Sequence, residues 1–149
     1  MPAIKERLKS GLDEGLHKGW HSFWWVLKLI VPISLATALL QYSGLLTRLD
    51  GLLAPVTHFL GLPVAAALPM VIGALAGVYA AIGAMAVLPL TQVEMTLVTI
   101  FVLIAHLLVQ EGIIQAKAGF RTGLSVLVRL AAGFLTVWAC GWFLVDAGR

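Results

Sequence analysis

The sequence predicts an all-α membrane protein with an N-terminal amphipathic helix, about three full spans and one broken or re-entrant helical hairpin. The first observation is composition, since 60% of the 149 residues are hydrophobic and only 11% are charged. Soluble domains carry about 25% charged residues. The second observation is an apolar segment, residues 62–90, that is too long for one ordinary span and is interrupted by glycine and proline. Together they predict a chain folded inside a bilayer.

The N-terminal segment, residues 1–20, is predicted to be an amphipathic helix at the membrane interface. Apolar residues recur every four positions among charged ones, at Ile4, Leu8, Leu12 and Leu16. This spacing places them in one stripe on a helix. Aromatic residues from Trp20 to Trp25 then mark the edge of the bilayer. The remainder, residues 21–149, is predicted to be a single membrane domain.

Three full spans are predicted in this membrane domain. The first covers about residues 21–43 and ends at Gly44, the second covers about residues 91–110, and the third covers about residues 124–145. Each is close to the roughly 20 apolar residues that cross a bilayer. Residues 45–61 are amphipathic, and we expect them to form a helix that lies at the interface.

The segment of residues 62–90 is predicted to form the broken hairpin, with its two apolar halves joined at Gly77. A hairpin that returns to its side of entry places eight basic residues together on the cytoplasmic side. They are Lys5, Arg7, Lys9, Lys18, Lys28, Lys117, Arg121 and Arg129. A full crossing would split them between the two sides. The charge distribution therefore favours a re-entrant hairpin and a cytoplasmic N-terminus.

Residues 43–77, SGLLTRLDGLLAPVTHFLGLPVAAALPMVIGALAG, resemble the Gate, or nucleoside-recognition, domain. The shared pattern is a Gly-Leu-Leu start, an amphipathic stretch with a central proline, a Gly-Leu-Pro and a small-residue-rich apolar segment. Similar modules occur in spore-maturation membrane proteins A and B and in the membrane part of the ferrous-iron transporter FeoB. The resemblance covers about residues 20–133 and implies a bacterial inner-membrane protein related to transport.

Six residues are predicted to form a substrate-binding site: Gly77, Tyr79, Gly83, Glu94, His106 and Gln110. The glycines have two interpretations. They allow close approach of helices, or they expose backbone amides at half-helix ends, where an anionic or polar group can bind. Tyr79 at the break would add a hydroxyl and an aromatic face. Only the second interpretation places a functional group at a break in the helix.

The polar residues of the predicted spans also have two interpretations each. Glu94 is a substrate or proton site beside the hairpin, or it is an interfacial carboxylate stabilised by a helix N-terminus. His106 and Gln110, four residues apart, line a cavity or form hydrogen bonds between helices. Ser34 lies on one face of the first span with Thr37 and Gln41, where all three line a path or bond to carbonyl groups.

The function predicted from these features is transport. A small protomer would associate with itself or with a second gate-type membrane protein to enclose a path for a small polar or ionic solute. The alternative is a membrane scaffold or assembly factor that does not transport. No enzyme signature, cofactor motif or metal-ligand cluster is present, and a lone Cys140 excludes an internal disulfide. The net charge of +3 suits anionic lipid headgroups rather than nucleic acid.

Overall fold

The computed structural model describes residues 2–146, together with the side chains of residues 6–44 and 51–144. This part of the chain forms helices and no strand, so the predicted all-α class is confirmed. The elements are α1 (Pro2–Tyr42), α2 (Leu45–Phe59), the 3-10 helix η1 (Val64–Ala66), α3 (Ala67–Ala76), α4 (Val78–Met85), α5 (Gln92–Ala105), α6 (Leu108–Lys117) and α7 (Thr122–Asp146). Three helical segments of the described chain are long and apolar enough to cross a membrane, as predicted: Glu6–Tyr42, Gln92–Lys117 and Thr122–Leu144.

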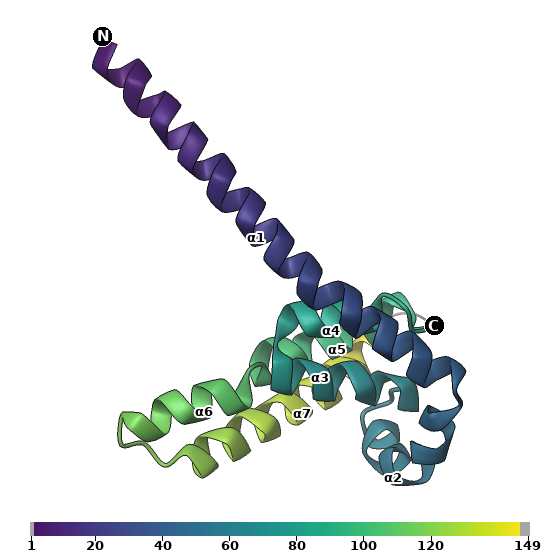
Figure 1. The fold of residues 1–149 in the computed structure, drawn as a ribbon. Helices are drawn as coiled ribbons and strands as arrows, with labels where there is room; N and C mark the ends of the chain where they lie inside the picture. Colours follow the sequence, from purple (N-terminus) through teal and green to yellow (C-terminus); the bar gives the residue numbers. More distant parts are fainter. Residues whose placement is uncertain (1, 147–149) are drawn as a thin grey trace.

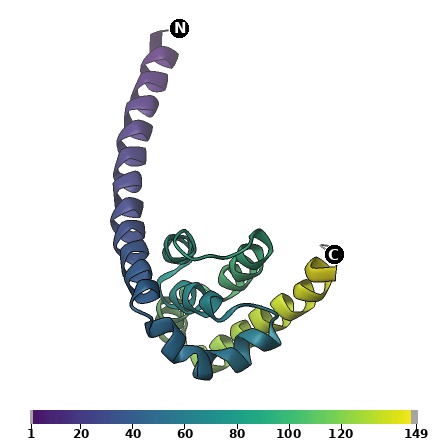
Figure 2. The ribbon, with the colours of Figure 1, turned by 90° about the vertical axis from the view of Figure 1, so that its right-hand side faces the viewer.

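Helix α1 is a single continuous helix of 41 residues. It joins the predicted interfacial helix and the predicted first span without a break, and Figure 1 shows its N-terminal half projecting away from the other helices. Figure 2, turned by 90°, shows the same separation. The location of residues 1–20 at a membrane interface stays a prediction. Gly44, with a φ of 70°, follows the end of α1 as expected.

Helix α2 confirms that residues 45–61 are mainly helical. The helix continues through both Gly51 and Pro55. A turn at Gly61, with a φ of 69°, then reverses the course of the chain. The segments Gly51–Phe59 and Val64–Ala76 meet at 91°. A right angle is what a helix lying at an interface needs before the chain enters the bilayer, although the interfacial position of α2 stays a prediction.

Helices α3 and α4 form the hairpin predicted for residues 62–90. A Cβ atom built on Gly73 would lie 3.0 Å from the Cβ of Ala81. In a continuous helix these residues would be about 12 Å apart along the axis, so the chain folds back at Gly77. Helix α1 packs against this hairpin, where the Ser34 hydroxyl donates a hydrogen bond to the Gly83 carbonyl at 2.6 Å.

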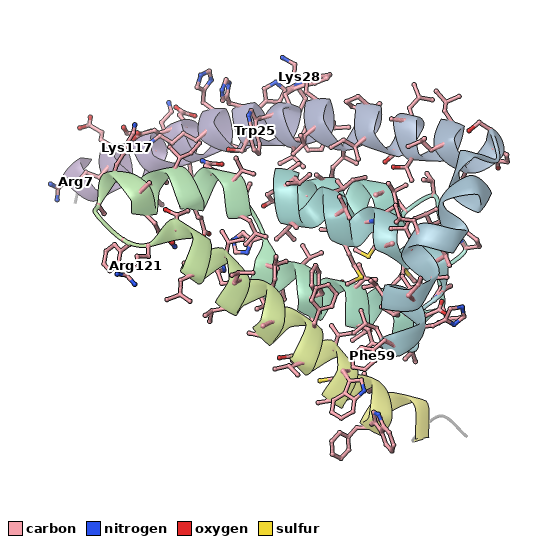
Figure 3. The ribbon with its side chains drawn as sticks, turned by 90° about the horizontal axis from the view of Figure 1, so that it is seen from below. Arg7, Trp25, Lys28, Phe59, Lys117 and Arg121 are labelled. Atoms are coloured by element: carbon pink, nitrogen blue, oxygen red, sulfur yellow. The ribbon has the colours of Figure 1, made fainter. Side chains whose placement is uncertain are left out.

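The span predicted for residues 91–110 is interrupted, which the sequence analysis did not foresee. Helix α5 ends at Ala105 and α6 begins at Leu108, although residues 92–117 together still have the length and hydropathy of one span. Helix α7 runs back along α5 and α6 (Figure 3). The buried core is built mainly from α3, α4 and α5, with Val137 from α7. Phe134 of α7 packs against it, with its ring 5.1 Å from that of Phe101.

Candidate functional site at two helix breaks

The two interruptions of the helices meet in space. Gly77 separates α3 from α4, and a Cβ built on it would lie 3.1 Å from Cδ2 of Leu107, which separates α5 from α6. Gly77 has a φ of 94° and a ψ of −179°, a backbone conformation that is essentially restricted to glycine. The hairpin tip therefore packs directly against the Leu107 side chain at the second break.

The break between α5 and α6 is held by polar side chains. A helix end leaves its last carbonyl groups without backbone partners, and inside a membrane each of them needs another donor. Arg129 of α7 donates from Nε to the Ile104 carbonyl at 2.9 Å. The Nδ1 atom of His106 lies 3.0 Å from the Leu103 carbonyl oxygen, a hydrogen-bonding distance.

The same side chains form a charged cluster. Arg129 also pairs with the Glu111 carboxylate through Nη1, and the other Glu111 oxygen lies 3.7 Å from Nε2 of His106. The three side chains are only 23%, 36% and 32% exposed, for Arg129, Glu111 and His106 respectively. Ionisable groups in membrane-spanning segments are costly unless they are paired, and they commonly mark functional sites. The three groups of this cluster are paired with one another, and they belong to segments that are long and apolar enough to span a membrane.

Glu111 and Arg129 were not among the predicted site residues. Glu111 directly follows the predicted second span, and Arg129 appears in the sequence only as one of the eight basic residues on the predicted cytoplasmic side. Arg129 nevertheless lies inside the predicted third span, and an arginine there is a signal by itself. What the sequence could not show is that the partners of Arg129 would be 18 and 25 residues away, at a helix break.

The predicted site residues do not all come together. Glu94 belongs to a capping box at the start of α5, where its carboxylate accepts from the Thr91 N–H at 2.6 Å and its own N–H donates to the Thr91 hydroxyl at 3.3 Å. His106 lies about 18 Å further along the helix. This arrangement matches the interpretation of Glu94 as a carboxylate stabilised by a helix N-terminus. Glu94 is therefore remote from the second break.

The remaining predicted residues divide between the breaks and the packing surfaces. Tyr79 is half exposed in the first turn of α4, next to Gly77. Gly83 faces α1, because a Cβ there would lie 3.1 Å from the Ile30 carbonyl oxygen. Gln110 is exposed in the first turn of α6. The predicted second span is interrupted between His106 and Gln110, so the two residues do not share one face of a continuous helix.

Three cavities adjoin these helices. One of about 350 Å³ lies between the end of α2 and α7. One of about 240 Å³ is lined mainly by apolar residues of α2, α3, α5 and α7, and a groove of about 650 Å³ follows α6 and α7. Arg129 lines the groove, but Tyr79, Glu94 and His106 line none of the three. Among the described residues, no group of three His, Cys, Asp or Glu side chains could hold a metal ion.

Residues 23–121 match the family model described as Gate, nucleoside recognition. The chain belongs to the Gate family. The Gate match contains both helix breaks and ends just before α7, so Arg129 reaches a break of the Gate region from outside the matched residues. The family and the apolar helices together identify an integral membrane protein.

A curated relative is the uncharacterized membrane protein YvoD of Bacillus subtilis (strain 168). It is 34% identical over 107 residues, which cover 71% of this chain and 34% of the relative. The chain therefore spans about a third of the length of the curated relative that it matches. No solved structure matches the chain.

Proposed function

We propose that this Gate protein is a small transport protein whose protomers associate to form a path for a small polar or ionic solute. The observation that supports this function best is the contact between Gly77 and Leu107. Because each residue precedes a new helix, the N-terminal ends of α4 and α6 begin beside the same point. Transporters place such interrupted helices at their substrate sites.

The chemistry of this point favours a solute rich in oxygen atoms. The first N–H groups of a helix have no intrahelical partner and carry partial positive charge. Tyr79 adds a phenol next to one break, and His106 adds an imidazole at the other. The family description makes nucleosides, which carry hydroxyl and carbonyl oxygens, the first solutes to test.

The proposed path needs more than one protomer. In the most apolar stretch of α1 only 6% of the residues are buried within the protein, and in that of α7 only 11% are buried. The corresponding share within residues 92–117 is 39%. Lipid or partner helices must cover the exposed faces. We propose a homo-oligomer or a complex with a second gate-type membrane protein, located in a bacterial inner membrane with the N-terminus in the cytoplasm.

A scaffold that does not transport is the second candidate, and the dense packing of the hairpin favours it. Ala80, Ala81 and Ala84 are completely buried. A Cβ on Gly73 would lie 2.6 Å from Val102, which leaves no room for a solute at that level of the hairpin. A scaffold requires this close packing, whereas a transporter requires polar space at the helix breaks as well.

Binding and flux measurements separate the two functions. The purified protein is screened with nucleosides and small organic anions by thermal shift, and a stabilising solute is then followed into proteoliposomes. We expect His106→Ala to weaken binding by about five- to more than a hundredfold, because the loss of a hydrogen-bonding partner costs roughly 1–3 kcal/mol. Tyr79→Phe tests the phenol in the same assay. His17→Ala, at an exposed position on α1, is the matched control.

The variants also define what would contradict the site. Glu94→Gln keeps an acceptor for the Thr91 N–H, so a large loss in this variant alone would move the site from the breaks to the start of α5. Equal binding and flux by wild type, His106→Ala and Tyr79→Phe would reject the site at the breaks. If no solute binds or crosses while the size of the assembly is intact, the scaffold function is supported.

A further inference from the structure

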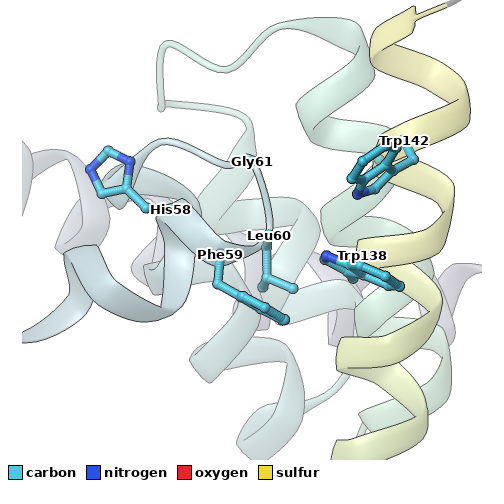
Figure 4. A pocket seen from close by; sticks show the side chains of 7 residues that line it. His58, Phe59, Leu60, Gly61, Trp138 and Trp142 are labelled. Atoms are coloured by element: carbon cyan, nitrogen blue, oxygen red, sulfur yellow. The ribbon is translucent and has the colours of Figure 1, made fainter.

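The cavity of about 350 Å³ between α2 and α7 is lined by three aromatic side chains (Figure 4). The rings of Phe59 and Trp138 are nearly parallel, with an interplanar angle of 7° and centroids 6.2 Å apart. Trp142 meets Trp138 edge to face, with centroids 6.1 Å apart. Rings from two separate elements therefore converge on one space. This space lies at the opposite end of α7 from the turn between α6 and α7, which Lys117 and Arg121 flank.

A backbone carbonyl oxygen, that of Leu60, also lies beside this cavity. The turn after α2 brings the Leu60 carbonyl oxygen to 3.5 Å from the position of a Cβ on Gly141. Gly141 lies between the two tryptophans in sequence, and its missing side chain leaves room at the lining. Among the described residues, no hydrogen bond reaches the carbonyl oxygens of Phe59 or Leu60. The negative end of the α2 dipole also lies here.

The described lining favours a cation over an anion as the ligand. Among the residues whose side chains the structure describes, the only titratable side chain in the lining is His58, and Figure 4 shows it directed away from the two indoles. Aromatic faces and carbonyl oxygens both attract positive charge. An anion would therefore meet aromatic faces and the Leu60 carbonyl oxygen, and among the described side chains only the two indole N–H groups on the cavity side could donate to it.

The spacing of the rings excludes an intercalated base. A flat aromatic ligand between two parallel rings needs about 7 Å, because stacked rings lie about 3.5 Å apart at van der Waals contact. Phe59 and Trp138 are closer than this. A compact cation needs only the outer ring faces and the carbonyl oxygens. We propose that this cavity binds an alkylammonium group, as found in choline and ethanolamine.

Such a group can come from a free solute or from the headgroup of a zwitterionic lipid. The chemistry at the rings is the same, because the ammonium carbons and protons contact the aromatic faces in both cases. Phe59 and Trp142 are each 64% exposed, so either source can reach the site from outside the protein.

The test uses the full chain purified in a non-ionic detergent and measures its melting temperature and tryptophan fluorescence. Choline chloride and tetramethylammonium chloride are titrated against sodium chloride at equal ionic strength. We expect a saturable rise in melting temperature with both ammonium salts and not with sodium chloride. Trp138→Leu should weaken the apparent affinity at least fivefold. Trp24→Leu, which removes an exposed indole from a separate aromatic cluster on α1, should leave it unchanged.

A second variant covers the case in which Trp138→Leu does not fold. Gly141→Leu keeps every aromatic ring but fills the space beside the Leu60 carbonyl, so it should also abolish the response to choline. Gly141→Ala meets only an ordinary contact at 3.5 Å and should retain most of the response. Responses to choline that are equal in the wild type and in Gly141→Leu would overturn the proposal. An equal response to sodium chloride would overturn it as well.

Nanodiscs distinguish the two sources. In phosphatidylglycerol discs, which lack an ammonium group, added choline should raise the melting temperature of the wild type. If a lipid headgroup is the natural ligand, phosphatidylcholine discs should give the higher melting temperature without choline, and added choline should change it little. If the ligand is a free solute, choline should act equally in both discs. Loss of the response in both kinds of disc would reject the site in a membrane.

Discussion

The two helix breaks that meet at Gly77 and Leu107 are built in opposite ways. The first depends on a glycine in a conformation that other residues avoid, and small apolar residues surround it. The second lies in an apolar, helix-favouring run, and it depends on hydrogen bonds from His106 and from Arg129 of another helix. The first break is therefore encoded locally, whereas the second is encoded by residues far apart in the chain.

Backbone strain is small at the first break and larger at the second. Gly77 adopts its positive φ without a steric penalty from a side chain. Leu107 has a φ of 51° and a ψ of 37°, and it is the only non-glycine residue with positive φ in the described chain. A left-handed leucine costs roughly 1–2 kcal/mol. The contacts around the second break must offset this cost, so the second break depends more on its surroundings.

The largest expected effect comes from breaking the contact at the first break. Gly77→Leu places a side chain where a Cβ already lies 3.1 Å from Leu107, in a conformation that leucine does not tolerate. We expect a loss of roughly 3 kcal/mol or more in stability, measured by unfolding in mixed detergent micelles. Gly119→Leu is the control, because Gly119 also has a positive φ, of 81°, but nothing within 4 Å. Equal losses in the two variants would mean that the packing of the breaks contributes nothing.

An intermediate effect is expected when the polar support of the second break is removed. Arg129→Leu leaves the Ile104 carbonyl without its donor and Glu111 without its partner, so stability should fall by about 1–3 kcal/mol. Arg129→Lys keeps a charge but lacks the planar fork that holds both groups, and it should restore only part of the loss. Adding Glu111→Leu to Arg129→Leu should recover stability, because the unpaired charge is gone. A double variant less stable than Arg129→Leu would argue against the ion pair.

The smallest effect isolates the strain at Leu107. Leu107→Ala removes the side-chain contact with Gly77 but keeps the unfavourable φ, whereas Leu107→Gly removes both. The glycine variant should be more stable than the alanine variant by about 1 kcal/mol, in the same unfolding assay. This is the reverse of the order at an ordinary helical position, where glycine is the less stable of the two by about 1 kcal/mol. The ordinary order at residue 107 would show that the second break is helical in the membrane.

The difference between the breaks also explains how far the sequence could be interpreted. Glycine and proline mark the first break. Such local signals also predicted the hairpin, the end of α1 at Gly44 and the last span. The second break has no local signal, because it requires Arg129, which lies 25 residues from its carbonyl partner. Of the predicted site residues, Gly77 and His106 lie at the breaks and Tyr79 lies next to one. Glu94 is also a polar residue of a predicted span, but in the structure it belongs to the helix cap at the start of α5.

Helix α1 is longer than a bilayer's hydrocarbon core is thick. A straight helix of 41 residues extends for about 60 Å, twice the roughly 30 Å of a bilayer's hydrocarbon core. A straight α1 that spans the membrane therefore carries its first residues about 30 Å beyond the hydrocarbon. A fluorophore near residue 6 would then be insensitive to quenchers fixed in the membrane. Strong quenching would require α1 to bend before Trp20, so that its first residues lie along the lipid surface.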